Sequence, residues 1–137
     1  MVNEFEGMIV GESDVPEAYI TFNFKGYQCG RHAKFAFQQT IGESYKLGID
    51  MREELPDGTI LTGVSSVVWK KRGNSLVDAS ADFPALADAV ETDSDGVDSM
   101  ITTVIDGTVA GNYVIKWDLT LDNGSVIKKE MEFKVRA

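Results

Sequence analysis

The sequence contains a single cysteine, Cys29, and a single histidine, His32, among its 137 residues. With one cysteine no disulfide can form within the chain, so packing and backbone hydrogen bonds must hold the fold together. No apolar run approaches the roughly 20 residues that a membrane-spanning helix needs. The opening residues, MVNEFEGMIV, place no basic stretch before an apolar one, so they do not read as a signal peptide. We therefore expect a soluble protein made in a cytoplasm.

Basic residues are missing from the whole segment between Gly73 and Ile115, which carries eight acids. The remainder of the chain is almost neutral, and the formal charge of the whole chain is −9. A protein that binds nucleic acid directly needs a basic face to neutralise phosphates, and an acidic protein is repelled by anionic membranes. The charge pattern therefore predicts neither a nucleic-acid nor a membrane partner. A basic protein surface, or cations, would suit the acidic segment better.

Few residues are suited to catalysis or to a metal centre. Cys29-Gly30-Arg31-His32 places the cysteine and the histidine in one short segment, but no serine has a nucleophile-elbow pattern around it. One cysteine and one histidine supply half of the four ligands of a closed zinc site, which only ligand sharing between chains would complete. We expect no enzymatic activity, no catalytic residues and no cofactor.

One acidic segment has the composition of a calcium loop. From Glu91 to Asp98, acids alternate with small polar residues and a glycine follows, so Glu91, Asp93, Asp95 and Asp98 are candidate Ca²⁺ ligands. An EF-hand loop also needs a bidentate glutamate at its twelfth position, which is Thr102 when counted from Glu91. A plain acidic loop is the alternative, since charge runs are usually just solvated.

Alternating apolar and polar residues predict strands along most of the chain. The clearest pair is residues 113–121 and 127–135, which the tight turn Asp122-Asn123-Gly124-Ser125 joins into a hairpin. A second turn, Pro56-Asp57-Gly58, separates two further runs. Residues 84–91, PALADAVE, are open between one or two helical turns and an irregular crossover. The other predicted strands cover residues 18–24, 34–40, 45–51, 60–71 and 97–105.

These segments add up to an all-β protein with turn signals between strands and little helix. The pattern favours an Ig-like antiparallel β-sandwich of about seven strands with an N-terminal extension. We place the sandwich domain in residues 43–137. Residues 1–42 are predicted to form an N-terminal arm with one or more additional strands.

Two features of residues 43–137 resemble an Ig-like domain without its disulfide. Trp69 lies on the third of the main strands, where Ig-type sandwiches often bury a tryptophan. The run Gly111-Asn112-Tyr113-Val114-Ile115 resembles the tyrosine-corner pattern G-x-Y-x-C, with Ile115 in the place of the cysteine. Leu47 or Ile49 would then take the place of the partner cysteine.

A narrower resemblance follows from the order of five short runs: Tyr45-x-Leu47-x-Ile49-Asp50, Leu55-Pro56-Asp57-Gly58-Thr59-Ile60, Val68-Trp69, Ala110-Gly111-Asn112-Tyr113 and Asp122-Asn123-Gly124. This order is similar to phage fibre–tail adaptor proteins, which are small Ig-like virion proteins that link tail or head machinery to fibres. It covers roughly the C-terminal two thirds of the chain. Residues 1–42 have no counterpart in it, and the returning strand reads Ser125-Val126-Ile127-Lys128 where the family often has an arginine.

The resemblance implies a non-enzymatic structural protein of a bacteriophage particle, either a tail/fibre or a head–tail adaptor. Such a protein would be made in the host cytoplasm and end in the virion, bound to tail, fibre or connector subunits and to copies of itself in a symmetric assembly. A capsid decoration protein uses the same fold and differs only in location. A carbohydrate-binding or adhesion module is the other alternative, and it needs an exposed aromatic platform.

Aromatic residues gather near the N-terminus, where eight of the thirteen lie within the first 45 residues. Ordinary core strands are one explanation, and the alternation around Phe22 and Phe24 favours it there. The other explanation is a segment that docks on a neighbouring subunit, because tyrosine and phenylalanine are common interface anchors. The candidate interface residues are Phe5, Tyr19, Tyr27, Phe35 and Phe37.

Overall fold

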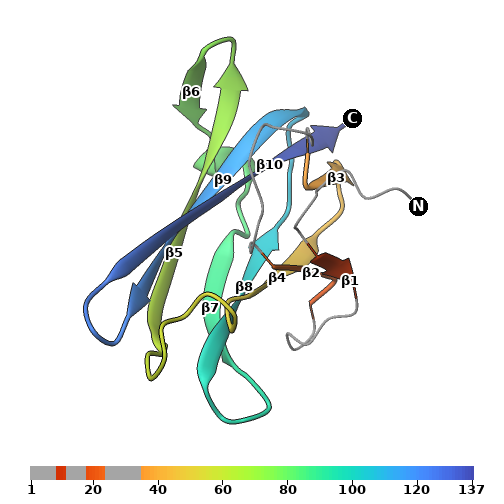
Figure 1. Ribbon diagram of the computed structural model, residues 1–137. Helices are drawn as coiled ribbons and strands as arrows, with labels where there is room; N and C mark the ends of the chain where they lie inside the picture. Colours follow the sequence, from red (N-terminus) through yellow and green to blue (C-terminus); the bar gives the residue numbers. More distant parts are fainter. Residues whose placement is uncertain (1–8, 12–17, 24–34) are drawn as a thin grey trace.

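The computed structural model describes residues 9–11, 18–23 and 35–137, which form two stacked β-sheets (Figure 1). The first sheet has the strand order β1-β2-β4-β8-β7, and the second has the order β3-β10-β9-β5-β6. The strands of the first sheet are β1 (Ile9–Gly11), β2 (Ile20–Asn23), β4 (Tyr45–Asp50), β8 (Asp98–Ile105) and β7 (Ala87–Thr92). Those of the second sheet are β3 (Phe37–Thr40), β10 (Val126–Arg136), β9 (Gly111–Leu121), β5 (Leu61–Arg72) and β6 (Ser75–Asp78).

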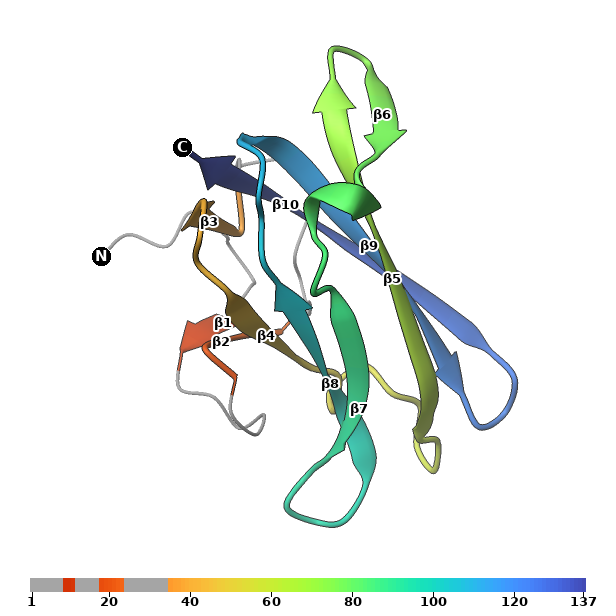
Figure 2. The same ribbon diagram turned by 180° about the vertical axis from the view of Figure 1, so that it is seen from behind.

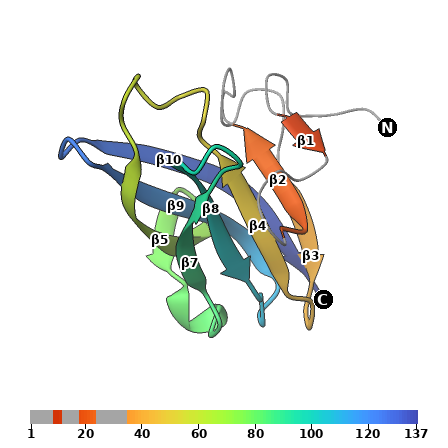
Figure 3. The same cartoon turned by 90° about the horizontal axis from the view of Figure 1, so that it is seen from below.

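The predicted all-β sandwich is confirmed, and its strand order is Ig-like. The orders β4-β8-β7 and β10-β9-β5-β6 match the B-E-D and G-F-C-C′ strands of an Ig sandwich. In Figure 3, seen from below, β4 and β8 of the first sheet cross β9 and β10 of the second. Among the described residues, no helix is long or apolar enough to cross a bilayer.

The sheets differ from the prediction in strand number and direction. Each sheet has five strands, so the described residues form ten strands rather than about seven. The sheets are also mixed rather than purely antiparallel, because β2 runs parallel to β4 and β3 runs parallel to β10. Both parallel pairs join strands that do not follow one another through a short turn, and a tight hairpin permits only antiparallel neighbours.

The hairpin of β9 and β10 forms as its sequence predicts. All five apolar residues from Tyr113 to Leu121 that share a face are buried, and so are Met131, Phe133 and Val135 on the returning strand. At the turn, Gly124 has a φ of +86°, a conformation that glycine adopts without steric cost. The two strands pair from Val126↔Thr120 to Val135↔Gly111.

The predicted tyrosine corner is present at the start of β9. The hydroxyl of Tyr113 donates to the carbonyl oxygen of Val109 at 2.6 Å. Burial, followed by the nearby charge of Asp82, raises the pKa of Tyr113 to about 12. Ile115 lies in the hydrophobic core together with Leu47 and Ile49, so an apolar cluster stands where an Ig domain has its disulfide.

The tryptophan in the core is not the one that the resemblance to Ig-like domains indicated. Trp117 on β9 is fully buried, whereas Trp69 on β5 is only partly buried. The neighbour of Trp69, Val68, pairs with the buried Ile115 and points into the core. Because side chains alternate along a strand, Trp69 must point to the other side of the sheet. The prediction of a buried Trp69 is therefore wrong.

Residues 84–91 were expected to form either helical turns or an irregular crossover. Most of them instead belong to the strand β7. The chain leaves β6 through a single 3₁₀ turn, Ser80–Asp82, and then pairs along β8 (Figure 2). An isolated helix of this length is unstable in water, whereas β8 offers a complete ladder of hydrogen-bonding groups. Pairing with β8 therefore overrides the helical preference of the alanines.

Strands from the predicted arm are built into both sheets. Phe22 on β2 is fully buried, and Phe37 on β3 stacks on Phe133 with ring centroids 4.8 Å apart. The side chain of Gln39, also on β3, donates to the carbonyl oxygen of Ile105 and accepts from the backbone N–H of Gly107. The division of the chain into residues 1–42 and a separate domain 43–137 stays a prediction.

Candidate functional site

The structure separates the predicted interface residues into different environments. Phe37 is only 7% exposed and packs in the core, so its prediction as an interface anchor is wrong. Its backbone pairs with that of Phe133, which faces inward, and a paired residue must face the same way. Phe35 is partly buried, and Tyr19 is 66% exposed. Phe5 and Tyr27 lie outside the described residues.

Tyr19 is held in place although most of its side chain is exposed. Its ring stacks on Tyr45 with centroids 4.6 Å apart, and its backbone N–H donates to the carbonyl oxygen of Lys46. The Tyr45 hydroxyl donates to Glu43, and burial together with this hydrogen bond raises the pKa of Tyr45 to about 12. Tyr19 thus offers a fixed aromatic surface next to β4, and its role as an interface residue stays a prediction.

The four predicted calcium ligands do not converge on one point. The Asp93 carboxylate accepts hydrogen bonds from the backbone N–H groups of Asp95 and Val97 and from the Ser99 hydroxyl. Separate hydroxyl groups, those of Thr102 and Thr92, donate to Glu91 and Asp98 respectively. Within the described ranges, no group of three or more acidic, histidine or cysteine side chains is arranged to hold a metal ion.

Asp93 instead organises the β7–β8 turn, and this leads to a testable prediction. The Ser99 hydroxyl and the Val97 N–H lower the pKa of the Asp93 carboxyl. Replacing Asp93 with alanine leaves these donors without their acceptor, so we expect the melting temperature to fall by about 2–5 °C. The matched variant Asp95→Ala removes a neighbouring acid and should leave the melting temperature unchanged within error.

Thermal unfolding of wild type and Asp93→Ala at several pH values provides a second test of this prediction. A carboxyl whose pKa is lowered in the folded protein stabilises it above the ordinary value of 3.8 and ceases to do so as the pH falls. The difference between wild type and Asp93→Ala should therefore shrink below that pH. Equal losses for Asp93→Ala and Asp95→Ala would show that net charge, not turn geometry, is responsible.

A shallow hollow of about 260 Å³ lies where this turn meets the β4–β5 loop. Arg52 lines it, and its guanidinium forms an ion pair with Asp50 at 2.6 Å. The Pro56-Asp57-Gly58 turn forms another wall, with Gly58 at a φ of +78° as predicted. The β4–β5, β7–β8 and β9–β10 loops all lie at this end of the sandwich (Figures 1 and 2).

A further candidate surface is the outer face of the second sheet, formed by the side chains that point away from the core. Trp69 pairs with Val114 across β5 and β9, and Val67 pairs with Lys116 beside them. Leu76 on β6 pairs with Lys71 and extends the same surface. Val67 is 37% and Leu76 is 41% exposed, so Val67, Trp69 and Leu76 form an apolar strip across β5 and β6 on this face.

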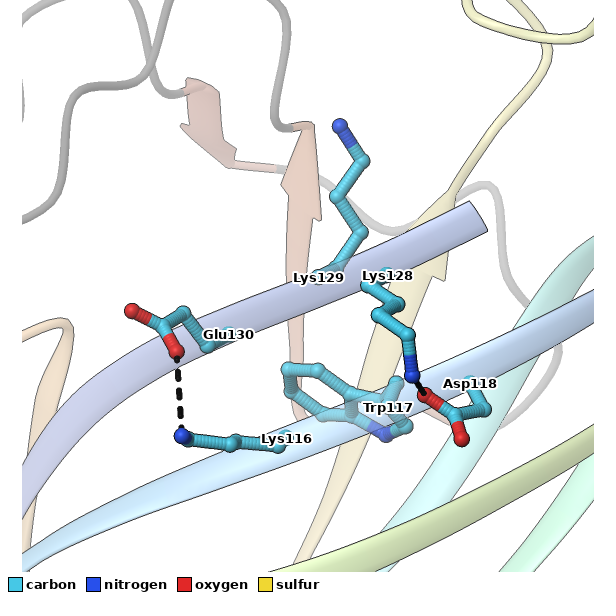
Figure 4. Close-up of a pocket in the computed structure, with 6 residues that line it drawn as sticks. All are labelled: Lys116, Trp117, Asp118, Lys128, Lys129 and Glu130. Atoms are coloured by element: carbon cyan, nitrogen blue, oxygen red, sulfur yellow. Dashed lines mark hydrogen bonds and ion pairs between the residues drawn. The ribbon is translucent and has the colours of Figure 1, made fainter. Parts of the chain in front are cut away.

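Ion pairs border the apolar strip on the side of β10. Lys71 reaches across β9 to pair with Glu132, which helps to explain why Val114 beneath them is only 7% exposed. Two directly opposed pairs follow along the strands, Lys128–Asp118 at 2.9 Å and Lys116–Glu130 at 3.9 Å (Figure 4). A hollow of about 310 Å³ lies over these two pairs.

The outer face has a different charge from the rest of the chain. By strand alternation it carries five basic and four acidic side chains, a net charge of +1, on a chain whose formal charge is −9. The basic ones are Lys71, Lys116, Lys128, Lys134 and Arg136, and the acidic ones are Asp78, Asp118, Glu130 and Glu132. An apolar strip with a border of paired charges is the usual anatomy of a protein interface.

Sequence reasoning missed this face because it assigned Trp69 to the core. A signal was present in Val67-Val68-Trp69, where three consecutive large apolar residues must place at least one on each side of a strand. When one face of a strand lies in the core and the opposite face lies toward solvent, such a run indicates an apolar patch on the solvent-facing side.

Comparison with known proteins gives few matches. No family model matches the chain, and no curated protein does. Among solved structures, that of murine CRIg is similar with 12% sequence identity and a TM-score of 0.39. The match covers 72% of this chain and 88% of the CRIg chain.

Proposed function

We propose that this protein is a non-enzymatic structural protein of a bacteriophage particle, a tail/fibre or head–tail adaptor that links neighbouring virion subunits through its outer face. The observation that carries the proposal is the apolar strip of Val67, Trp69 and Leu76 with its border of ion pairs. The order of turn and strand motifs in residues 43–137, which resembles fibre–tail adaptors, supports the phage assignment.

Linking subunits in this way requires no chemistry. Burying the strip would remove apolar surface from water, which is the main source of affinity in most protein complexes. Trp69 is suited to be its anchor because tryptophan is enriched among the residues that dominate binding energy. The bordering lysines and acids would select the orientation of the partner, since charges at an interface rim act mainly on specificity and association rate.

The sandwich beneath the face suits the role of a rigid spacer. β5, β9 and β10 have eleven or twelve residues each and pair along most of their length. The other side of these strands contributes the fully buried Trp117, Tyr113 and Phe133 to the core. A surface supported by such a core changes shape little on binding.

The test is whether the chain enters phage particles and whether the outer face is needed. Particles released by the cells that carry the gene would be purified by density gradient, and the chain would be quantified in them by mass spectrometry. We expect a fixed copy number per particle and at least a tenfold loss for Trp69→Ala. Val109→Ala removes an exposed apolar side chain outside the face and should be incorporated normally, and Tyr19→Ala tests the interface residue predicted from the sequence.

Other outcomes are equally informative. A chain absent from particles would overturn the proposal, and binding on a glycan array would then favour the adhesion alternative. Loss of incorporation for Tyr19→Ala but not for Trp69→Ala would move the interface to the N-terminal strands. Immunogold labelling on the head rather than on the tail or neck would identify a capsid decoration protein.

A further inference from the structure

The charges over the hollow on the outer face form a pattern that is complementary to itself. On β9, Lys116 is followed on the same face by Asp118, and on β10 their partners are Glu130 and Lys128. Positive and negative groups therefore alternate both along the strands and across them. This is a checkerboard of four charges on an otherwise open surface.

Such a checkerboard meets a copy of itself without opposing like charges. In a two-fold dimer that joins face to face, the axis lies in the plane of the interface and the same patch is used twice. With the axis across the strands, Lys116 faces the Asp118 of the second copy. With the axis along the strands, Lys116 faces the Glu130 of the second copy. Either choice pairs every lysine with an acid.

The net charge of the chain favours the same face. Two copies with a formal charge of −9 each repel one another through most of their surfaces. The outer face, with a net charge of +1, can approach a second copy while the acid-rich β7–β8 turn belongs to the other sheet. An unrelated acidic partner would need only the lysines, and it would leave the acids of the checkerboard without counterparts.

The size of the face is also in the range that a dimer needs. Three strands of eleven or twelve residues give a flat area on the order of 500–700 Å², before side-chain relief is counted. A standard stable complex buries about 800 Å² on each partner. The outer face, with the exposed β6 at its edge, therefore reaches the lower end of the area that such interfaces bury, about 600 Å² on each partner.

We infer that a second copy of this chain packs on the outer face in a two-fold dimer, with the axis through the charge checkerboard and with Val67 and Trp69 beside it in the interface. The inference names the partner of the surface used in the proposed function and rests on it for that surface's role as an interface. The neighbouring virion subunit that the outer face links is then a second copy of this chain.

Sedimentation velocity of the purified full-length chain tests the dimer directly. We expect a species of about 30 kDa, twice the 15.0 kDa of one chain, at micromolar concentration. Val67→Asp places a new carboxylate in both halves of the interface and should weaken the dimer at least tenfold. Val109→Asp makes the same change at a valine that is 41% exposed outside the face, and it should sediment as wild type.

A charge reversal provides a second, independent variant. Lys116→Glu opposes an acid of the second copy for either axis, so it should also weaken the dimer, whereas its own ion pair is exposed and adds little to folding. Circular dichroism would confirm that each variant remains folded. A monomer at all concentrations, or a dimer that neither variant weakens, would overturn the inference.

The two proposals can fail separately. A monomeric chain whose Trp69→Ala variant still fails to enter particles would overturn the dimer and retain the adaptor. A dimer that dissociates with Val67→Asp but never enters particles would retain the dimer and overturn the adaptor.

Discussion

Replacing Trp117 with alanine is expected to lower the free energy of unfolding by about 3–5 kcal/mol, the range for removal of a fully buried tryptophan. The side chain has no exposed surface, and its Nε1–H donates to the Thr103 hydroxyl at 2.9 Å. That hydroxyl donates in turn to the Asp88 carboxylate at 2.6 Å, which also accepts from Ser66 on β5. The substitution therefore opens a cavity and removes one end of a hydrogen-bonded chain that joins the two sheets.

Trp69→Ala is the matched control, because the same side chain is removed from the other face of the same sheet. Trp69 is only partly buried, so we expect a loss of about 1–2 kcal/mol in the monomer. Trp117→Phe keeps most of the apolar volume and removes the hydrogen bond with a smaller part of the packing, so we expect a loss of about 1–2 kcal/mol. Urea unfolding followed by circular dichroism measures all three variants. A larger loss for Trp69→Ala than for Trp117→Ala would restore the sequence-based assignment.

Adding one methyl group at Gly107 is expected to destabilise the protein by about 2–3 kcal/mol, which is large for so small a change. A Cβ atom at this position would lie 2.6 Å and 2.9 Å from the two methyl carbons of Val135 and 3.1 Å from the Gln39 Oε1 atom. Val135 is 1% exposed and Gln39 is fully buried, so neither can move aside without disturbing the core. The Gly107 N–H also donates to that same Gln39 oxygen at 2.8 Å.

Gly63→Ala is the control for this prediction. A Cβ atom at Gly63 would meet only the Cβ of Thr120 at 3.9 Å, which is an ordinary contact. We expect a change within about 0.5 kcal/mol, and in the stabilising direction, because alanine restricts the unfolded chain more than glycine does. Thermal and urea unfolding of the two variants side by side provide the measurement. Similar losses at both positions would mean that strand flexibility, not the contact with Val135, decides the cost.

Much of the fold could be predicted from local sequence. Alternation from Tyr113 to Leu121 identified the inward face of β9 because strand side chains alternate strictly between two sides. Asn123-Gly124 identified the hairpin because glycine adopts the positive φ that this turn requires. The tyrosine corner was predictable because donor and acceptor lie four residues apart, so no distant segment decides the contact.

The candidate site was predictable only in part. Tyr19 is exposed as expected, but Phe37 is in the core, and Glu91, Asp93 and Asp98 each accept hydrogen bonds from different neighbouring groups. The composition of that segment was visible in the sequence, but the direction of each carboxylate was not. The direction of a carboxylate depends on the position of its residue in a turn or strand. Here the Asp93 carboxylate accepts hydrogen bonds from groups of its own loop.

The sequence by itself determined seven of the strand segments, where two turns reverse the chain, and that one core must be built without a disulfide. Only the tertiary structure decided which tryptophan is buried, that β2 and β3 run parallel to their neighbours, and that residues 87–92 join β8. The physical reason is that alternation assigns residues to two sides of a strand without saying which side a second sheet will cover. That choice depends on register with strands distant in sequence, and it leaves Val67 and Trp69 on the outer face.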